Sequence, residues 1–112
     1  MEDPNQTLIP SAFMALYSAH GRPTAPRAHV EARHDLCEDM AVQMTTLCAA
    51  LEHRHDLSRQ EVLRRCWTGL LQPGSGVEPP EANWVVARTA ELLEWPQPAF
   101  LAAEGAGPGR RG

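Results

Sequence analysis

A helical spacing of apolar positions runs through the middle of the chain, from about Pro26 to His55. No glycine and no further proline interrupts this stretch, and apolar or semi-polar side chains recur at gaps of three and four. That period is typical of one face of an α-helix. The recurring positions are Val30, His34 or Cys37, Met40, Ala41, Met44, Leu47, Cys48 and Leu51.

This predicted helix is long for a small protein. About 28 residues at a rise of about 1.5 Å each extend roughly 42 Å. A globule built from 112 residues has a radius of gyration of only about 13 Å. The helix must therefore project beyond its partners in the chain or pack against another chain. We take its length as an indication of a homodimer.

A second helix is expected to follow a break at residues 56–58. Ser58 and Glu61 have the spacing of a capping box, in which the serine accepts from the backbone of the first turn and the glutamate reaches back. The helix is expected to reach about Leu71. Residues 73–76, Pro-Gly-Ser-Gly, then form a turn.

A third helix is predicted to begin at Pro79, because proline fits the first turn of a helix and acidic residues near it favour the positive end of the helix dipole. Pro96 is expected to end it. Its apolar stripe is predicted to consist of Trp84, Val85, Arg88, Leu92 and Trp95.

The N-terminal region is predicted to hold one short helix between Ser11 and His20. Ser11 would cap it, and Phe13, Leu16 and Tyr17 would share a face. A glycine and two prolines in residues 21–26 are expected to break regular structure. The predicted fold is all-α: a small bundle of three main helices plus a short N-terminal helix. We expect a flexible arm over 1–10, one helical domain over 11–103 and a disordered glycine-rich tail over 104–112.

Composition narrows the function classes. The chain has a mass of 12.3 kDa, a formal charge of −4 and a pI near 5.7, so no general attraction to nucleic acid or anionic lipid is expected. No apolar run approaches the roughly 20 residues of a membrane helix, and the acidic N-terminus does not resemble a signal peptide. Three cysteines without a CxxC pair favour reduced thiols, so we expect a cytoplasmic protein.

Candidate catalytic chemistry is sparse. The chain has no lysine, which excludes Schiff-base chemistry and a P-loop lysine, and it has no glycine-rich phosphate motif. Cys66 follows two arginines that could lower the pKa of its thiol. Its apolar neighbours, however, indicate burial. We therefore predict a protein that is not an enzyme, with no catalytic residues and no cofactor.

The sequence points instead to a partner surface at the exit of the third helix. Trp95 and Phe100 flank a proline-bracketed segment, and aromatic side chains of this kind are enriched in interface hot spots. Arg59, Arg64 and Arg65 would form a polar rim. The segment either docks back on its own bundle or holds a partner. The resulting prediction is a small accessory or adapter protein that acts through protein–protein contacts.

Two alternatives stay open. The first is a protein that binds Cu(I) or another thiolate-bound metal, because soft ligands recur along the long helix and on the next one: His34, Cys37, Met40, Met44, Cys48 and Cys66. The second is a dimeric DNA-binding regulator that uses the arginines of the second helix. A helix-turn-helix needs a turn of only three or four residues, whereas about eight separate these helices.

Several segments resemble a group of short bacterial proteins, some of which are labelled ATPase with chaperone activity. The segments are Ala12–Tyr17, Ala25–Arg27, Leu36–Ala41 and Trp84–Trp95, and the likeness covers most of residues 11–95. The chain has no Walker motif, so the resemblance implies association with an ATPase or chaperone and not hydrolysis. It assigns no functional residues.

Overall fold

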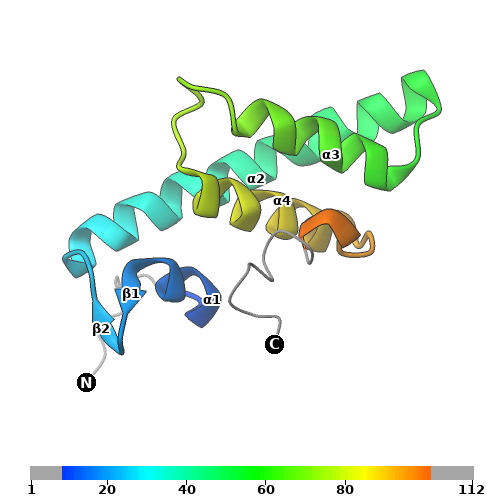
Figure 1. Cartoon of the computed structure of the whole chain (residues 1–112). Coiled ribbons are helices and arrows are strands. Elements are labelled where there is room, and N and C mark those ends of the chain that lie inside the picture. Colours follow the sequence, from blue (N-terminus) through cyan, green and yellow to red (C-terminus); the bar gives the residue numbers. More distant parts are fainter. Residues whose placement is uncertain (1–8, 102–112) are drawn as a thin grey trace, which may run out of the picture. The chain divides into compact units, whose positions relative to one another are not determined.

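The computed structural model describes residues 9–101, and helices dominate them (Figure 1). This confirms the predicted all-α class. The elements in chain order are α1 (Ser11–Met14), the 3-10 helix η1 (Ala15–Tyr17), β1 (Ser18–Ala19), β2 (Arg22–Pro23), α2 (Arg27–His55), α3 (Arg59–Leu70) and α4 (Pro79–Leu93). The predicted tail lies outside the described residues, as does all but the end of the predicted arm. Contacts divide the predicted domain into two compact units, Met1–Leu36 and Cys37–Gly112.

The first unit contains a hairpin that the sequence analysis did not expect. β1 and β2 pair antiparallel, with Ser18 opposite Pro23 and Ala19 opposite Arg22. The two residues between the strands, His20 and Gly21, have φ values of 55° and 76°. Left-handed backbone at both central positions is typical of the tight turns that connect hairpin strands. The expectation that residues 21–26 hold no regular structure is therefore wrong at β2.

The N-terminal helix is also shorter than predicted. α1 ends at Met14 and tightens into η1, and Ser11 is its first residue and not its cap. Phe13 is fully buried, and its ring packs edge-on against His34 at a centroid distance of 5.3 Å. Tyr17 packs in the same way against His29 at 5.8 Å. These ring contacts join the N-terminal segment to the first turns of α2.

α2 runs from Arg27 to His55 and confirms the predicted long helix. In the second unit its buried face includes Cys37, Ala41 and Cys48, which follow the predicted period. Leu47 departs from the prediction, since its side chain is 49% exposed. Adjacent helix residues point about 100° apart, so burying Cys48 directs Leu47 away from the core.

α3 begins where the capping box predicts. The Ser58 hydroxyl oxygen accepts from the backbone N–H of Glu61 at 3.1 Å. Glu61 directs its carboxylate to Arg65. A complete capping box begins α4 instead: Glu78 and Glu81 each accept from the other's backbone N–H. Glutamate at this cap position is uncommon, because short oxygen-bearing side chains are preferred there.

The buried face of α4 differs from the predicted stripe. Its buried residues are Glu81, Ala82, Val85, Val86, Thr89 and Ala90, whereas Leu92 of the predicted stripe is 36% exposed. The helix ends before Trp95, because Glu94 adopts a left-handed conformation with φ of 59° and the backbone N–H of Trp95 returns to the carbonyl of Ala90 at 2.9 Å. This is the closing pattern of a Schellman motif. Small residues at positions 82 and 90 allow close packing of the helix.

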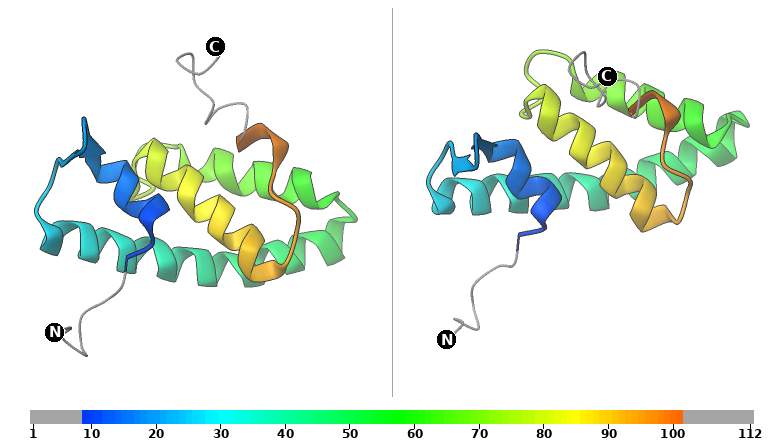
Figure 2. Two further views of the ribbon diagram at one scale, coloured as in Figure 1. Left: turned by 90° about the horizontal axis from the view of Figure 1, so that it is seen from below. Right: turned by 60° about the horizontal axis from the view of Figure 1, so that its bottom comes forward.

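In the second unit, α3 and α4 lie against each other and against the second part of α2 (Figure 2). The core between them is made of the buried residues of α2 already named, together with Val62, Leu63, Cys66 and Leu70 of α3 and the buried face of α4. Within residues 9–101, no helix has both the length and the apolar character needed to cross a bilayer.

Candidate functional site

The segment after α4 folds back over α3, and we call residues 95–100 the C-terminal strap. Trp95 and Phe100 are only 8% and 7% exposed. The backbone N–H of Ala99 donates to Oε1 of Gln60 at 2.7 Å, and the Gln97 side chain donates to the carbonyl of Ala87 at 3.0 Å. These bonds attach the strap to both α3 and α4. The sequence left open whether this segment docks on its own bundle or holds a partner. In the structure it docks on its own chain.

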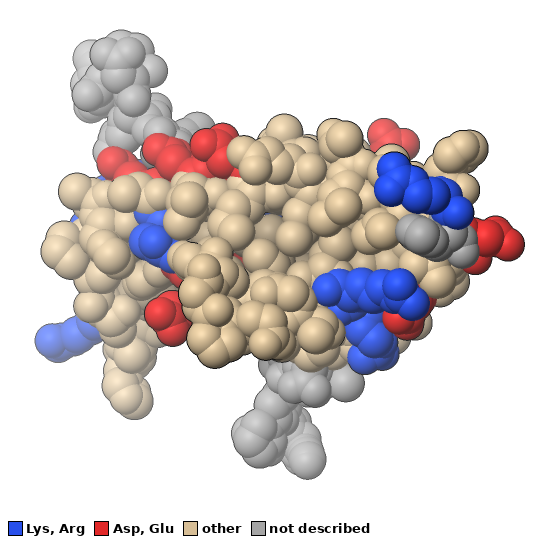
Figure 3. Space-filling view, turned by 90° about the horizontal axis from the view of Figure 1, so that it is seen from above, with Lys and Arg blue, Asp and Glu red and all other residues tan. Residues whose placement is uncertain are grey.

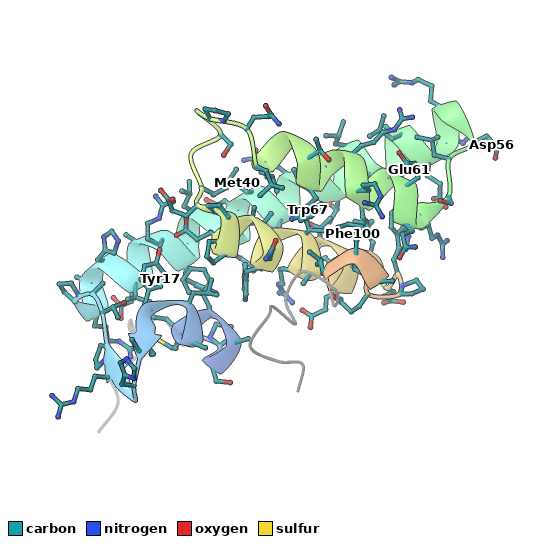
Figure 4. All side chains as sticks on the ribbon, in the orientation of Figure 1. Tyr17, Met40, Asp56, Glu61, Trp67 and Phe100 are labelled. Carbon is teal, nitrogen blue, oxygen red and sulfur yellow. The ribbon has the colours of Figure 1, made fainter. Side chains whose placement is uncertain are left out.

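Arginines of α3 cover the two aromatic rings of the strap. The guanidinium carbon of Arg59 lies 5.2 Å from the ring centroid of Trp95, and that of Arg64 lies 4.7 Å from that of Phe100. Phe100 also packs on Trp67, with centroids 4.8 Å apart (Figure 4). A cation within about 6 Å of an aromatic centroid is attracted by the ring. Four of the five predicted partner-binding residues therefore lie close together. Their contacts, however, are with residues of the same chain and not with a partner.

This geometry bears on the predicted partner surface, whose binding role stays a prediction. Arg59 also pairs with Glu52 at 2.9 Å, and the remaining arginine, Arg65, pairs with Glu61 at 3.2 Å. The aromatic rings are buried and the guanidinium groups are engaged within the chain. The apolar area that Trp95 and Phe100 would need to present to a partner is already covered. The Arg59 and Arg65 side chains nevertheless remain about half exposed, and the DNA-binding alternative stays a prediction.

The predicted metal-ligand set does not form one site. Cys37 precedes Cys48 by eleven positions on one helix, which separates them by about 16 Å along its axis. Met40 is about 12 Å from Cys48 by the same reasoning, and His34 comes still earlier. Within residues 9–101, no three His, Cys, Asp or Glu side chains converge as a metal site would require. Helical spacing aligned these residues on one face but could not bring them to one point.

Two of the predicted ligands do meet. The Sγ atoms of Cys48 and Cys66 are 3.4 Å apart, across the contact between α2 and α3. The hydrogen bond to Cys66 and burial both raise the pKa of the Cys48 thiol. The hydrogen bond from Cys48 lowers the pKa of Cys66, against the opposing effect of burial.

A bidentate ion pair fixes α4 on α2. Nε and Nη2 of Arg88 donate to the two carboxylate oxygens of Glu38 at 2.9 and 3.0 Å, and Nη1 donates to Glu91 at 2.9 Å. These bonds raise the pKa of Arg88 above its ordinary value. Bidentate pairing adds geometric specificity to the attraction. The pair holds α4 along one side of α2. The opposite side of α2 therefore remains exposed to solvent.

The solvent side of α2 has an unusual composition. From Met40 to Leu51, twelve successive residues carry no charge. The exposed Asp39 directly precedes this run. Glu52 directly follows it and pairs with Arg59, and the exposed Arg54 comes two positions later. The exposed side chains between them include Val42 and Ala49, which point to one flank. Six positions from Asp39 to Arg54 share the face opposite the buried residues, at gaps of three and four. We call this set the α2 face: Asp39, Gln43, Thr46, Leu47, Ala50 and Arg54.

The α2 face was missed when only the buried period of the helix was followed. The signal that could have found it is the length of the uncharged run, since a helix that faces water on one side usually places charged residues there. Leu47 is about half exposed in the middle of the run. Figure 3 shows uncharged side chains forming a broad area on one face of the molecule, with arginines toward the end where α2 passes into α3.

Comparison of the chain with protein-family models, with curated proteins and with solved structures finds no match. The resemblance to proteins labelled ATPase with chaperone activity therefore stays a prediction, as does the ATPase or chaperone partner that it implies.

Proposed function

We propose that the chain is a protein-interaction module that pairs with a second copy of itself through the α2 face. The observation that carries this proposal is the outward side of α2, where uncharged residues are flanked by the exposed Asp39 toward one end and the exposed Arg54 toward the other. A role in binding without catalysis agrees with the absence of lysine and of phosphate-binding motifs from the sequence.

The symmetry of the α2 face favours a second copy as its occupant. The spacing of its residues is symmetric about a midpoint between Thr46 and Leu47, so each position has an equidistant counterpart on the other side. The positions are 39, 43, 46, 47, 50 and 54. In a twofold dimer the same patch of both copies meets, so residue i contacts j and j contacts i. An antiparallel pair of α2 helices centred on this midpoint sets Asp39 opposite Arg54 at both ends.

Charge complementarity then fixes the direction of pairing. A parallel pair would set Asp39 beside Asp39 and Arg54 beside Arg54, and like charges in contact are unfavourable. The antiparallel pair replaces both repulsions by ion pairs. In the middle, Leu47 meets uncharged side chains of the second copy, and burial of its exposed area contributes about 25 cal/mol for each Å² of apolar surface removed from water.

The length of the face is compatible with helix pairing. Its sixteen positions extend about 22 Å along the helix. The middle of the face holds uncharged side chains of small to moderate size, at Gln43, Thr46 and Ala50. Two helix axes can therefore approach to about 8–10 Å, the usual separation of packed helices. This pairing also gives the expected homodimer a physical basis beyond the length of α2.

The test is the molar mass in solution, measured by sedimentation equilibrium over a range of concentrations. The account predicts a reversible monomer–dimer equilibrium for the natural chain. Leu47→Glu should weaken dimerisation at least about tenfold, which corresponds to 1.4 kcal/mol, because a carboxylate would enter the centre of the pair.

Leu71→Glu is the matched control. Leu71 is also an exposed leucine, 38% accessible, but it follows α3 and lies off the α2 face. It should leave the dimer constant unchanged. A monomer at every concentration would contradict the proposal, and so would a dimer that Leu47→Glu leaves intact.

A further inference from the structure

Cys48 and Cys66 stand out as a pair of nucleophilic side chains that the proposed function does not use. Their Sγ atoms are 3.4 Å apart although eighteen positions separate the residues in the sequence. Cys48 is fully buried and Cys66 is 6% exposed. The turn between α2 and α3, supported by the Ser58 cap and the Arg59–Glu52 ion pair, holds the two helices in this register.

We propose that Cys48 and Cys66 form a modification site at which a hydroperoxide converts the two thiols into an intramolecular disulfide. A disulfide requires the sulfurs to approach to about 2.05 Å. Starting from contact distance, the change is shared by two side chains on helices that already pack together.

The two cysteines have different roles in the reaction. The thiolate is the reactive form of cysteine, and the hydrogen bond from Cys48 favours the thiolate at Cys66. Cys66 is also the more accessible of the two. Cys66 is therefore the residue that attacks the peroxide, and Cys48 is the residue that resolves the product.

Oxidation of the pair proceeds in two steps. The Cys66 thiolate attacks one peroxide oxygen, the O–O bond breaks, and the leaving alkoxide or hydroxide takes a proton, which leaves Cys66 as a sulfenic acid. The sulfur of Cys48 then attacks the sulfur of Cys66. The S–O bond breaks, the S–S bond forms, and the hydroxide leaves as water with the proton of Cys48. Two thiols and one hydroperoxide give one disulfide, one alcohol or water, and one further water.

Cys37 provides an internal control. It is also buried on α2, but it lies about 16 Å along the helix from Cys48. It cannot reach either sulfur of the pair without unfolding. The proposal therefore predicts one specific linkage and one thiol that is spared.

The test is oxidation of the folded full chain by a small excess of hydrogen peroxide, followed by intact mass and peptide mapping without reductant. The expected product has lost two hydrogen atoms, links Cys48 to Cys66 and retains Cys37 as an unoxidised thiol. Circular dichroism before and after oxidation should show unchanged helix content. A disulfide that includes Cys37, a linkage between chains, or three unreacted thiols would overturn the proposal.

Single variants test the two roles. Cys48→Ala should stop the reaction at the sulfenic acid of Cys66, which a dimedone probe traps, and should move the pH profile of that trapping to higher pH because the hydrogen-bond donor is lost. Cys66→Ala should leave Cys48 unlabelled, and Cys37→Ala should not alter the product. Equal labelling of Cys48 and Cys66 in the two single variants would contradict the assigned roles. If a variant fails to fold, peptide mapping of the oxidised natural chain still decides whether the disulfide forms.

Discussion

The C-terminal strap and the α2 face differ in residue type and in exposure to solvent. The strap carries tryptophan and phenylalanine, which are typical of binding hot spots, yet both rings are buried within the chain and covered by exposed arginines of α3. The α2 face carries leucine, alanine, threonine and glutamine, and it stays in solvent. Residue type alone therefore does not identify an interface. What matters is whether the chain itself already covers the residue.

The largest expected effect concerns the strap. Phe100→Ala removes the ring that packs on Trp67 and beneath Arg64, and truncation of a buried phenylalanine costs about 3 kcal/mol or more. Urea unfolding should show this loss. The dimer constant from sedimentation should not change under conditions where the variant is folded. A variant of unaltered stability but weaker pairing would reverse the roles assigned to the two regions.

A smaller effect is expected at the ion pair that fixes α4 beside α2. Arg88→Gln removes the bidentate contact with Glu38 and the contact with Glu91. Because these groups are about one-third exposed or more, solvent screening limits the loss to about 1 kcal/mol. Thermal unfolding at low and high salt measures it, and the difference between the variant and the natural chain should shrink as salt rises. A salt-independent difference would indicate a packing effect instead.

The smallest effect is expected at the rim of the strap. Arg64→Ala removes the cation over the Phe100 ring, and an interaction of this kind at an exposed site contributes about 0.5–1 kcal/mol. Denaturant unfolding should detect a loss of that size, with unchanged dimerisation. Arg54→Ala is the matched change on the α2 face: it should weaken pairing while the free energy of unfolding of the monomer stays constant. Weaker dimerisation of Arg64→Ala together with lower monomer stability of Arg54→Ala would contradict the comparison.

Local signals in the sequence were sufficient for the helices themselves. The absence of glycine and further proline predicts α2, and the spacing of Ser58 and Glu61 predicts the start of α3. The end of α4 was harder to predict, because a glutamate and not a glycine takes the left-handed position at residue 94. The hairpin was missed for a related reason, since His20 supplies one of its two left-handed positions.

The candidate sites depended on contacts that spacing along the chain does not encode. Ala99 and Gln60 are 39 positions apart, and the covering of Trp95 by Arg59 follows from how α3 and α4 pack. The meeting of Cys48 and Cys66 requires both the turn between α2 and α3 and the register of the two helices. The α2 face differs from these, because its uncharged run is visible in the sequence alone.

Exchange of the two terminal charges of the α2 face tests the central claim most directly. Asp39→Arg alone and Arg54→Asp alone each set like charges opposite one another in the antiparallel pair, and sedimentation equilibrium at low salt should show weaker dimerisation for both. The double variant restores opposite charges at both ends and should dimerise like the natural chain. A double variant no better than the single variants, or single variants that pair normally, would contradict an antiparallel pair of α2 helices.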